Sequence, residues 1–236
     1  DLTASHGQLY YYWVRATNAL SSAASFSDSD SGYRGLGDQT GLTASDGTFT
    51  NKVALAWPAI EGATGYEIRR NDSNDVGSST ILVASTAATS ADDVTAAVGV
   101  QYWYWVRSTN AITTSGYGTP DSGWVNLMAP AWITASDEAF TDKIEVVWAP
   151  SASALGYEVY RNVTDETVSA TAIGISASTN YDDLTAGLGT NYYYWVKATN
   201  ALGESAFSAF DIGTRKNPAV LVLLKPTVDA NGTITP

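Results

Sequence analysis

A tyrosine- and tryptophan-rich stretch of nine residues occurs three times in this chain and constrains the fold more than any other feature. The copies are Tyr10–Asn18, Tyr102–Asn110 and Tyr192–Asn200. Consecutive copies begin about 90 residues apart, which is too long for a solenoid unit and suits small whole domains in tandem. The sequence therefore predicts several domains of one kind rather than one large core.

Side chains within the stretch alternate as a β-strand requires. In the third copy, the residues expected to face the core are Tyr192, Tyr194, Val196 and Ala198. The residues expected on the outer face are Tyr193, Trp195, Lys197 and Thr199. A second alternating segment, Lys52–Trp57, is predicted to place Val53, Leu55 and Trp57 on one face, and Tyr66 and Ile68 are predicted to point inward from the next strand.

The repeat divides the 236 residues into two complete units, a partial unit and a tail. In chain order these are residues 1–37 (partial), 38–126, 127–216 and 217–236 (an apolar tail strand or the start of a further domain). Units of about 90 residues can bury a working core without disulfides or metals. The joints are short, so neighbouring domains are expected to be held semi-rigidly. They are Arg34–Thr40, Val125–Ala131 and Arg215–Pro218.

The partial unit is expected to contain only the last two strands of a domain, at Tyr10–Asn18 and about Ala24–Asp30. A two-stranded ribbon is marginal on its own in water, so something is expected to cover it. The chain opens on Asp1, in the middle of the repeat pattern and without an initiator methionine. We therefore expect the sequence to be a segment of a longer protein.

Composition narrows the classes of function. Twenty-four acidic and twelve basic residues give a net charge of −12, which disfavours nucleic acid and anionic membranes as partners. The sequence has no run of 18 apolar residues, so membrane insertion is not expected. Cysteine is absent, which excludes disulfides and thiolate chemistry. Abundant aromatic, serine, threonine and glycine residues suit a β-rich protein that is secreted or at the cell surface.

These patterns resemble fibronectin type III domains of bacterial extracellular proteins. The residues that carry the resemblance are Trp57, Trp148, Tyr66, Tyr157, Tyr102, Tyr104, Val106, Tyr192, Tyr194 and Val196. The resemblance implies an all-β fold of tandem immunoglobulin-like sandwiches. It also implies that Tyr102 and Tyr192 form tyrosine corners, in which the hydroxyl binds backbone a few residues upstream. Family members serve chiefly as spacers and adhesive modules.

Catalysis is not expected from this set of residues. His6 is the only histidine, and no partner positions repeat around it. The pairs Asp92-Asp93 and Asp182-Asp183 are adjacent on predicted strands, so their carboxylates point to opposite faces and do not converge on one bond. No cofactor is expected. A structural calcium ion at these pairs, or at Asp72–Asp75, is a minor alternative to plain turn-capping.

The outward aromatic residues form a candidate interaction face. Its members are Trp103, Trp105, Arg107, Tyr160, Tyr193, Trp195 and Lys197. Three readings are open: an outer face that covers itself through contacts of Arg or Lys with the rings, contact with a neighbouring domain or subunit, and a platform for stacking sugars.

Two functions follow from these expectations. The first is a non-catalytic structural or adhesive protein of a cell-surface filament, which self-associates by strand complementation. Its assembly strand would be the apolar run Val220, Leu221, Val222, Leu223 and Leu224. The alternative is a set of spacer or carbohydrate-contacting modules in a larger secreted polysaccharide-degrading enzyme.

Overall fold

The computed structural model describes residues 1–218, 227–228 and 234–235, and in this part of the chain the secondary structure is almost entirely β. The only helical element among these residues is one 3₁₀ turn, η1 (Val76–Ser78). The predicted all-β fold class is confirmed. The predicted assembly strand Val220–Leu224 lies outside the described residues, beyond which β18 (Thr227–Val228) pairs with β19 (Ile234–Thr235).

Two compact units make up the chain. Unit 1 comprises Asp1–Met128, Ser151–Leu155 and Ala198–Ala206, and unit 2 comprises Ala129–Pro150, Gly156–Lys197 and Phe207–Pro236. Two short segments of the second complete repeat are thus grouped with unit 1. The domain limits drawn from the repeat, at residues 37, 126 and 216, stay a prediction.

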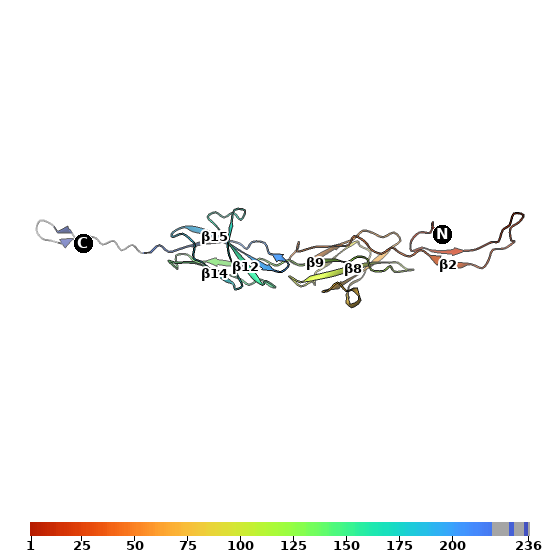
Figure 1. Ribbon diagram of the computed structural model, residues 1–236, viewed down its shortest axis with the longest axis horizontal. Helices are drawn as coiled ribbons and strands as arrows, with labels where there is room; N and C mark the ends of the chain where they lie inside the picture. Colours follow the sequence, from red (N-terminus) through yellow and green to blue (C-terminus); the bar gives the residue numbers. More distant parts are fainter. Residues whose placement is uncertain (219–226, 229–233, 236) are drawn as a thin grey trace. The chain divides into compact units, whose positions relative to one another are not determined.

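Unit 1 contains a complete β-sandwich. One sheet has the order β3 (Thr43–Ala44), β4 (Val53–Ala56) and β7 (Ser90–Asp93). The other has the order β6 (Thr80–Thr86), β5 (Gly65–Asn71), β8 (Gln101–Thr109) and β9 (Asp121–Trp124), and Figure 1 shows β8 and β9 side by side. All these pairings are antiparallel.

The core between these sheets comes from the predicted inward faces. Its buried members are Leu42, Val53, Leu55, Trp57, Tyr66, Ile68, Tyr104, Val106 and Val125. The Trp57 and Tyr66 rings meet edge to face at 5.7 Å between centroids. Each of these aromatic side chains removes a large apolar area from water. Packing the two sheets with their alternating apolar residues inward is therefore the stable arrangement.

The second complete repeat, most of which belongs to unit 2, has the same arrangement. One sheet has the order β10 (Ile133–Ala135), β11 (Ile144–Trp148) and β14 (Asn180–Asp183). The other contains β13 (Thr171–Ser176), β12 (Gly156–Asn162), β15 (Asn191–Asn200) and β16 (Gly203–Glu204), while β17 (Asp211–Thr214) also pairs with β15. Trp148 meets Tyr157 edge to face at 5.4 Å, as Trp57 meets Tyr66. Tyr194, Val196 and Ala198 are fully buried, as their positions on the strand predicted.

Residues 1–37 form a two-stranded sheet, which we call the N-terminal ribbon. It pairs β1 (Leu9–Tyr12) with β2 (Asp30–Tyr33). The predicted second strand, about Ala24–Asp30, is wrong because the register places Tyr10 opposite Gly32, as β8 places Tyr102 opposite Gly123. Residues 24–29 therefore correspond to the irregular segment before β9, and β1 ends at Tyr12 rather than at Asn18.

Candidate functional site

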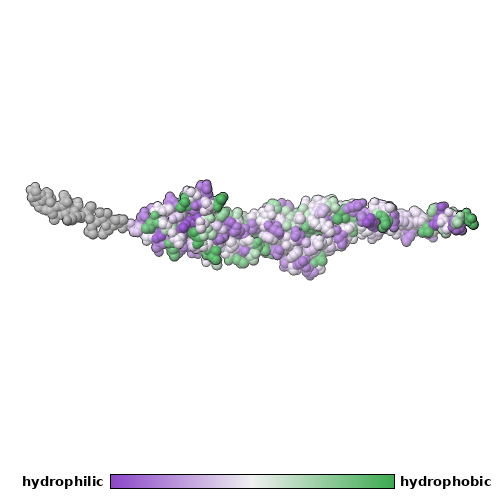
Figure 2. All heavy atoms as spheres, turned by 45° about the horizontal axis from the view of Figure 1, so that its top comes forward, coloured by the Kyte–Doolittle hydropathy of each residue, from purple (hydrophilic) through white to green (hydrophobic). Residues whose placement is uncertain are grey.

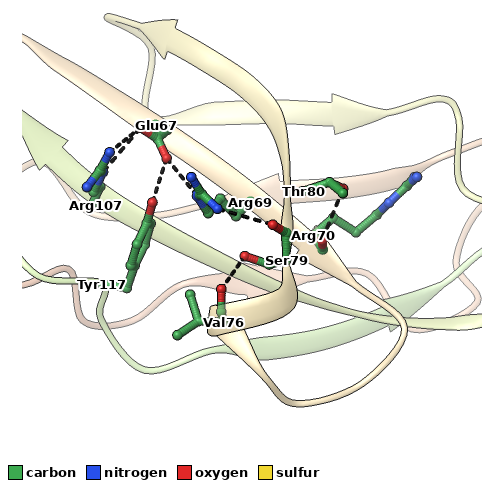
Figure 3. Close-up of polar contacts among 8 residues, drawn as sticks. All are labelled: Glu67, Arg69, Arg70, Val76, Ser79, Thr80, Arg107 and Tyr117. Carbon is green, nitrogen blue, oxygen red and sulfur yellow. Dashed lines mark hydrogen bonds and ion pairs between the residues drawn. The ribbon is translucent and has the colours of Figure 1, made fainter.

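Glu67 anchors the outer face of the β6-β5-β8-β9 sheet. It lies on β5 directly opposite Arg107 of β8, and its side chain is nearly buried. Arg69 Nε donates to Glu67 Oε1 at 2.9 Å and Arg107 Nε donates to Oε2 at 3.2 Å, while the Tyr117 hydroxyl also donates to Oε1. Figure 3 shows these three side chains converging on the carboxylate; the four residues are called the Glu67 cluster.

The charge of the Glu67 carboxylate is balanced by the hydrogen-bond donors and arginines of its own cluster. Burial alone would raise the pKa of Glu67, but hydrogen bonds from Tyr117, Arg107 and Arg69 outweigh this effect and hold the pKa below its ordinary value. Burial raises the pKa of the Tyr117 phenol, and its hydrogen bond to the Glu67 carboxylate raises this pKa further, against the opposing effect of the two arginines. The guanidinium groups of Arg69 and Arg107 also lie over the Tyr117 ring, at 5.6 and 4.9 Å from its centroid. Such a carboxylate stays ionised and has no role as a general acid.

Unit 2 carries a related but different set of residues on the corresponding face. The Tyr160 hydroxyl donates to Glu158 Oε2 at 2.6 Å. Lys197 Nζ lies 4.4 Å from the centroid of the Phe207 ring and 5.6 Å from that of Tyr160. Lys197 therefore packs against two rings of this face, which is the kind of contact that a self-covering face would require.

Two members of the predicted interaction face are not available at the surface. Trp105 and Trp195 are each 3% exposed, although their strand positions point them to the outer side. Trp195 is covered by Tyr193, which stacks on it at 6.3 Å, and by Phe210 at 6.0 Å. Trp103 and Tyr193 keep partial exposure, as do Arg107, Tyr160 and Lys197. Alternation shows which side of a strand a residue faces, but not whether a loop covers that side.

A buried carboxylate occupies the interior of each complete unit. In unit 1 Asp93 Oδ2 accepts from Arg70 Nη1 at 2.6 Å and from the Tyr104 hydroxyl at 3.0 Å. Thr95 donates to Asp93 Oδ1 through its backbone N–H at 2.9 Å and its hydroxyl at 2.8 Å. The Arg70 guanidinium lies 4.5 Å above the Tyr102 ring. We call these five residues the Asp93 cluster.

The same arrangement recurs in unit 2 as the Asp183 cluster. Its members are Asp183, Arg161, Thr185, Tyr194 and Tyr192. In both clusters burial opposes ionisation, but the hydrogen bonds and ion pairs prevail and keep the pKa of the aspartate below its ordinary value. Burial and the neighbouring carboxylate raise the pKa of Tyr104 and Tyr194. Sequence reasoning missed both arginines, although Arg70 and Arg161 stand at the same place in the repeated Gly-Tyr-Glu strand.

The carboxylates considered for calcium are engaged by protein groups. Asp93 and Asp183 bind arginine, whereas Asp92 pairs with Lys52 at 2.8 Å and Asp182 with Lys143 at 3.0 Å. In the Asp72–Asp75 loop, Asp75 caps η1 by accepting from Gly77 N–H at 2.9 Å. Among the described residues there is no group of three or more histidine, cysteine or acidic side chains that could hold a metal ion.

The tyrosine corner implied by the family resemblance is present at Tyr192. Its hydroxyl accepts from Gly187 N–H at 3.2 Å. Tyr10 in the N-terminal ribbon makes the same contact with Ser5 N–H, also at 3.2 Å. His6 Nδ1 lies 3.6 Å from the Glu61 carboxylate.

The sandwiches, their order and these corners define a class of protein. A segment of two fibronectin type III domains from chicken tenascin superposes with a TM-score of 0.56 at 17% identity, covering 75% of this chain and 98% of that one. The chain has the fold of tandem fibronectin type III domains. Such modules are non-catalytic, and they are typical of extracellular proteins.

Particular relatives come from bacteria. Exoglucanase B of Cellulomonas fimi is 28% identical over 201 residues, which are 75% of this chain and 17% of the enzyme. The chain thus spans less than a fifth of that enzyme's length. An Fn3-like protein from Clostridium thermocellum is 29% identical, with a TM-score of 0.33, and the match covers 39% of this chain and 99% of that one. No protein-family model matches the sequence. In the described part of the chain, helices of the length and apolar character needed to cross a membrane are absent.

Proposed function

We propose that this chain is a non-catalytic spacer within a larger secreted polysaccharide-degrading enzyme. The observation that carries the proposal is the match to exoglucanase B over 201 residues. The closed Glu67, Asp93 and Asp183 clusters support it, because their carboxylates are committed to holding the modules together. The net charge of −12 also fits a soluble extension that does not adhere to anionic surfaces.

A spacer needs joints that hold their geometry, and unit 1 contains one. Asn110 Nδ2 donates to the carbonyl of Gly7 at 2.9 Å and to that of Gly62 at 3.0 Å. Leu36 and Gln39 of the connecting segment are buried. The Ser108 hydroxyl donates to Gly37 O at 3.1 Å. The segment between the N-terminal ribbon and the complete sandwich is therefore packed against protein rather than free. Such packing limits the motion of the ribbon relative to the sandwich, as a spacer of fixed length requires.

The test is to recover the native polypeptide from culture supernatant with antibodies raised against this chain. The proposal expects a polypeptide several times longer than 236 residues, with glucan-hydrolysing activity that co-purifies with it. A native polypeptide that carries no hydrolase domain would exclude it.

A structural or adhesive filament is the second candidate. The observation in its favour is the N-terminal ribbon, which exposes Tyr11, Trp13, Val14 and Phe26. Large apolar side chains gathered at a surface favour association. Sedimentation at increasing concentration tests it: a filament former grows in size, whereas a discrete monomer at high concentration counts against this reading.

A further inference from the structure

Each complete repeat carries a partly exposed aromatic ring at the same place on its outer sheet face. Trp103 of β8 and Tyr193 of β15 both hold the second position of the repeated tyrosine-rich stretch. The residue two positions further along each strand, Trp105 or Trp195, points to the same side but is only 3% exposed. The partly exposed ring therefore lies beside a buried indole, which limits its freedom to move.

In unit 2 a third ring completes this surface. Tyr193 stacks on Trp195 at 6.3 Å between centroids, with 22° between the ring planes. Phe210, which is 44% exposed, meets both rings edge to face, at 5.1 Å from Tyr193 and 6.0 Å from Trp195. Figure 2 shows hydrophobic residues at the surface among hydrophilic ones in the part of the chain that carries β12, β14 and β15 in Figure 1. Tyr193 and Phe210 thus form an apolar surface of fixed geometry.

In unit 1 the neighbour of Trp103 is a second tryptophan. The register places Gln101 opposite Trp124 and Trp103 opposite Ser122, so the two tryptophans are diagonal neighbours on the outer face. Trp124 is also partly exposed. Its ring lies close to Gly47, where a Cβ would be only 2.7 Å from Trp124 Nε1. Glycine at this position allows the indole to lie against the backbone.

The side chains that border the rings on both faces are neutral hydrogen-bonding groups. Gln101 and Asn191 lie two residues before the ring, on the same side of the strand. Gln101 Nε2 donates to Ser122 Oγ at 3.0 Å, and Thr214 Oγ1 donates to Asn191 Oδ1 at 2.6 Å. All four side chains are exposed or partly exposed. Amides and hydroxyls in this position are able to bind the hydroxyl groups of a ligand.

These features favour a neutral sugar chain as the occupant. A pyranose ring has apolar C–H faces and a rim of hydroxyl groups, which match aromatic rings bordered by amides and hydroxyls. The net charge of −12 disfavours an anionic chain, as do Asp137 and Glu138, which line one hollow together with Asn191 and Thr214. The proposed function adds a third argument, since it assigns the chain to an enzyme that acts on polysaccharides.

We propose that the outer sheet faces of the two complete repeats bind a neutral glucan. Trp103 and Trp124 stack on its sugar rings in unit 1, and Tyr193 and Phe210 do so in unit 2. The inference rests on the proposed function and extends it, because the spacer itself then contacts the polysaccharide.

The test follows the mobility of the full chain in native gels that contain hydroxyethyl cellulose, a neutral glucan, or polygalacturonate, an anionic chain. The expected result is retardation by the glucan alone. Combined Trp103→Ala and Tyr193→Ala substitutions are expected to weaken binding by about tenfold or more, because each ring loses its apolar contact with the sugar. Unchanged mobility in the glucan gel, or equal retardation by polygalacturonate, would overturn the proposal.

Matched variants separate stacking from a loss of folding. Phenylalanine at positions 103 and 193 keeps a ring at each site, so binding is expected to be retained. Trp132→Ala removes a tryptophan that is 51% exposed but directly precedes β10 of the other sheet, and no change is expected. Binding as weak in the phenylalanine variant as in the alanine variant, or an equal loss in Trp132→Ala, would contradict stacking at these faces.

Two further outcomes identify what has failed. Sedimentation that increases with protein concentration, and that the alanine variant abolishes, would assign these faces to a second copy of the chain and overturn the proposal. A native polypeptide that carries a hydrolase domain, combined with no retardation of this chain by the glucan, would remove the glucan site and leave the spacer function in place.

Discussion

Among single residues, Asp93 and Asp183 stand out because each is a carboxylate buried in an otherwise apolar interior. Asp93 is 0% exposed and Asp183 1%. An isolated ion at such a depth would be costly, so the arginine, threonine and tyrosine around it are a requirement rather than an addition. The two clusters therefore tie the Gly-Tyr-Glu strand to the tyrosine-rich strand in each complete unit.

Removing the arginine from one cluster is expected to destabilise its unit. Arg161→Met leaves Asp183 buried without its cation, and we expect a loss of about 3 kcal/mol in the free energy of unfolding of unit 2. The measurement is urea denaturation. Lys143→Met is the matched control, because it removes a cation from the exposed partner Asp182, and little change is expected. Equal effects of the two substitutions would contradict the role given to Asp183.

The lowered pKa of Asp93 and Asp183 predicts the direction of pH dependence. The ordinary aspartate value is 3.8, and a folded-state pKa below it means that the unfolded chain binds protons first. The stabilisation is present above this value and is lost as the pH falls through the folded pKa. Melting temperatures are therefore expected to drop between about pH 5 and about pH 2, less steeply in Asp183→Asn. A variant with the same slope as the parent chain would contradict this assignment.

At the scale of elements, the joint between the N-terminal ribbon and the complete sandwich depends on one backbone conformation. Gly7 has φ +67°, and a Cβ there would lie 2.1 Å from Asn110 Nδ2, the atom that binds the Gly7 carbonyl. Glycine is thus required both for the left-handed conformation and for the close approach.

Gly7→Ala is expected to loosen this joint. Strain and the displaced Asn110 amide should cost about 1–3 kcal/mol of local stability. The readout is faster hydrogen exchange at the amide of residue 7, which in the parent chain donates to Arg34 O. Gly35→Ala is the control, since nothing lies within 4 Å of a Cβ there. If both variants exchange alike, the joint does not depend on Gly7.

Alternation in the sequence was sufficient to predict the inward faces of β4, β5, β8 and β15, because burial on one side of a sheet imposes a period of two. It did not predict that Trp105 and Trp195 are buried, since the covering comes from irregular segments such as the one holding Phe210. The second ribbon strand was misplaced because the regular ladder begins only at Asp30: Ser27 N–H donates to Val14 O, but residues 24–29 form no strand. Arg70 and Arg161 were overlooked as members of the buried clusters because a charged residue near the end of a strand is usually exposed to solvent.

At the scale of the whole molecule, the chain consists of non-catalytic modules with one packed joint, and the buried carboxylates of these modules are bound by arginine, tyrosine and threonine side chains of the same module. In exoglucanase B the matching segment is 17% of the length, so most of that enzyme lies outside it. Under the proposed function, the modules would set the distance to a catalytic domain elsewhere in the native polypeptide. Chemistry on a polysaccharide would then depend on that domain, and access to an extended insoluble substrate would depend on the spacer.

Deletion of residues 38–216 from the native polypeptide tests this account most directly, with hydrolysis of a soluble oligosaccharide and of an insoluble glucan measured side by side. The account predicts an unchanged rate on the soluble substrate and a loss of about threefold or more on the insoluble one. An equal loss on both substrates would place these residues in the catalytic machinery, and no loss on either would remove the spacer role.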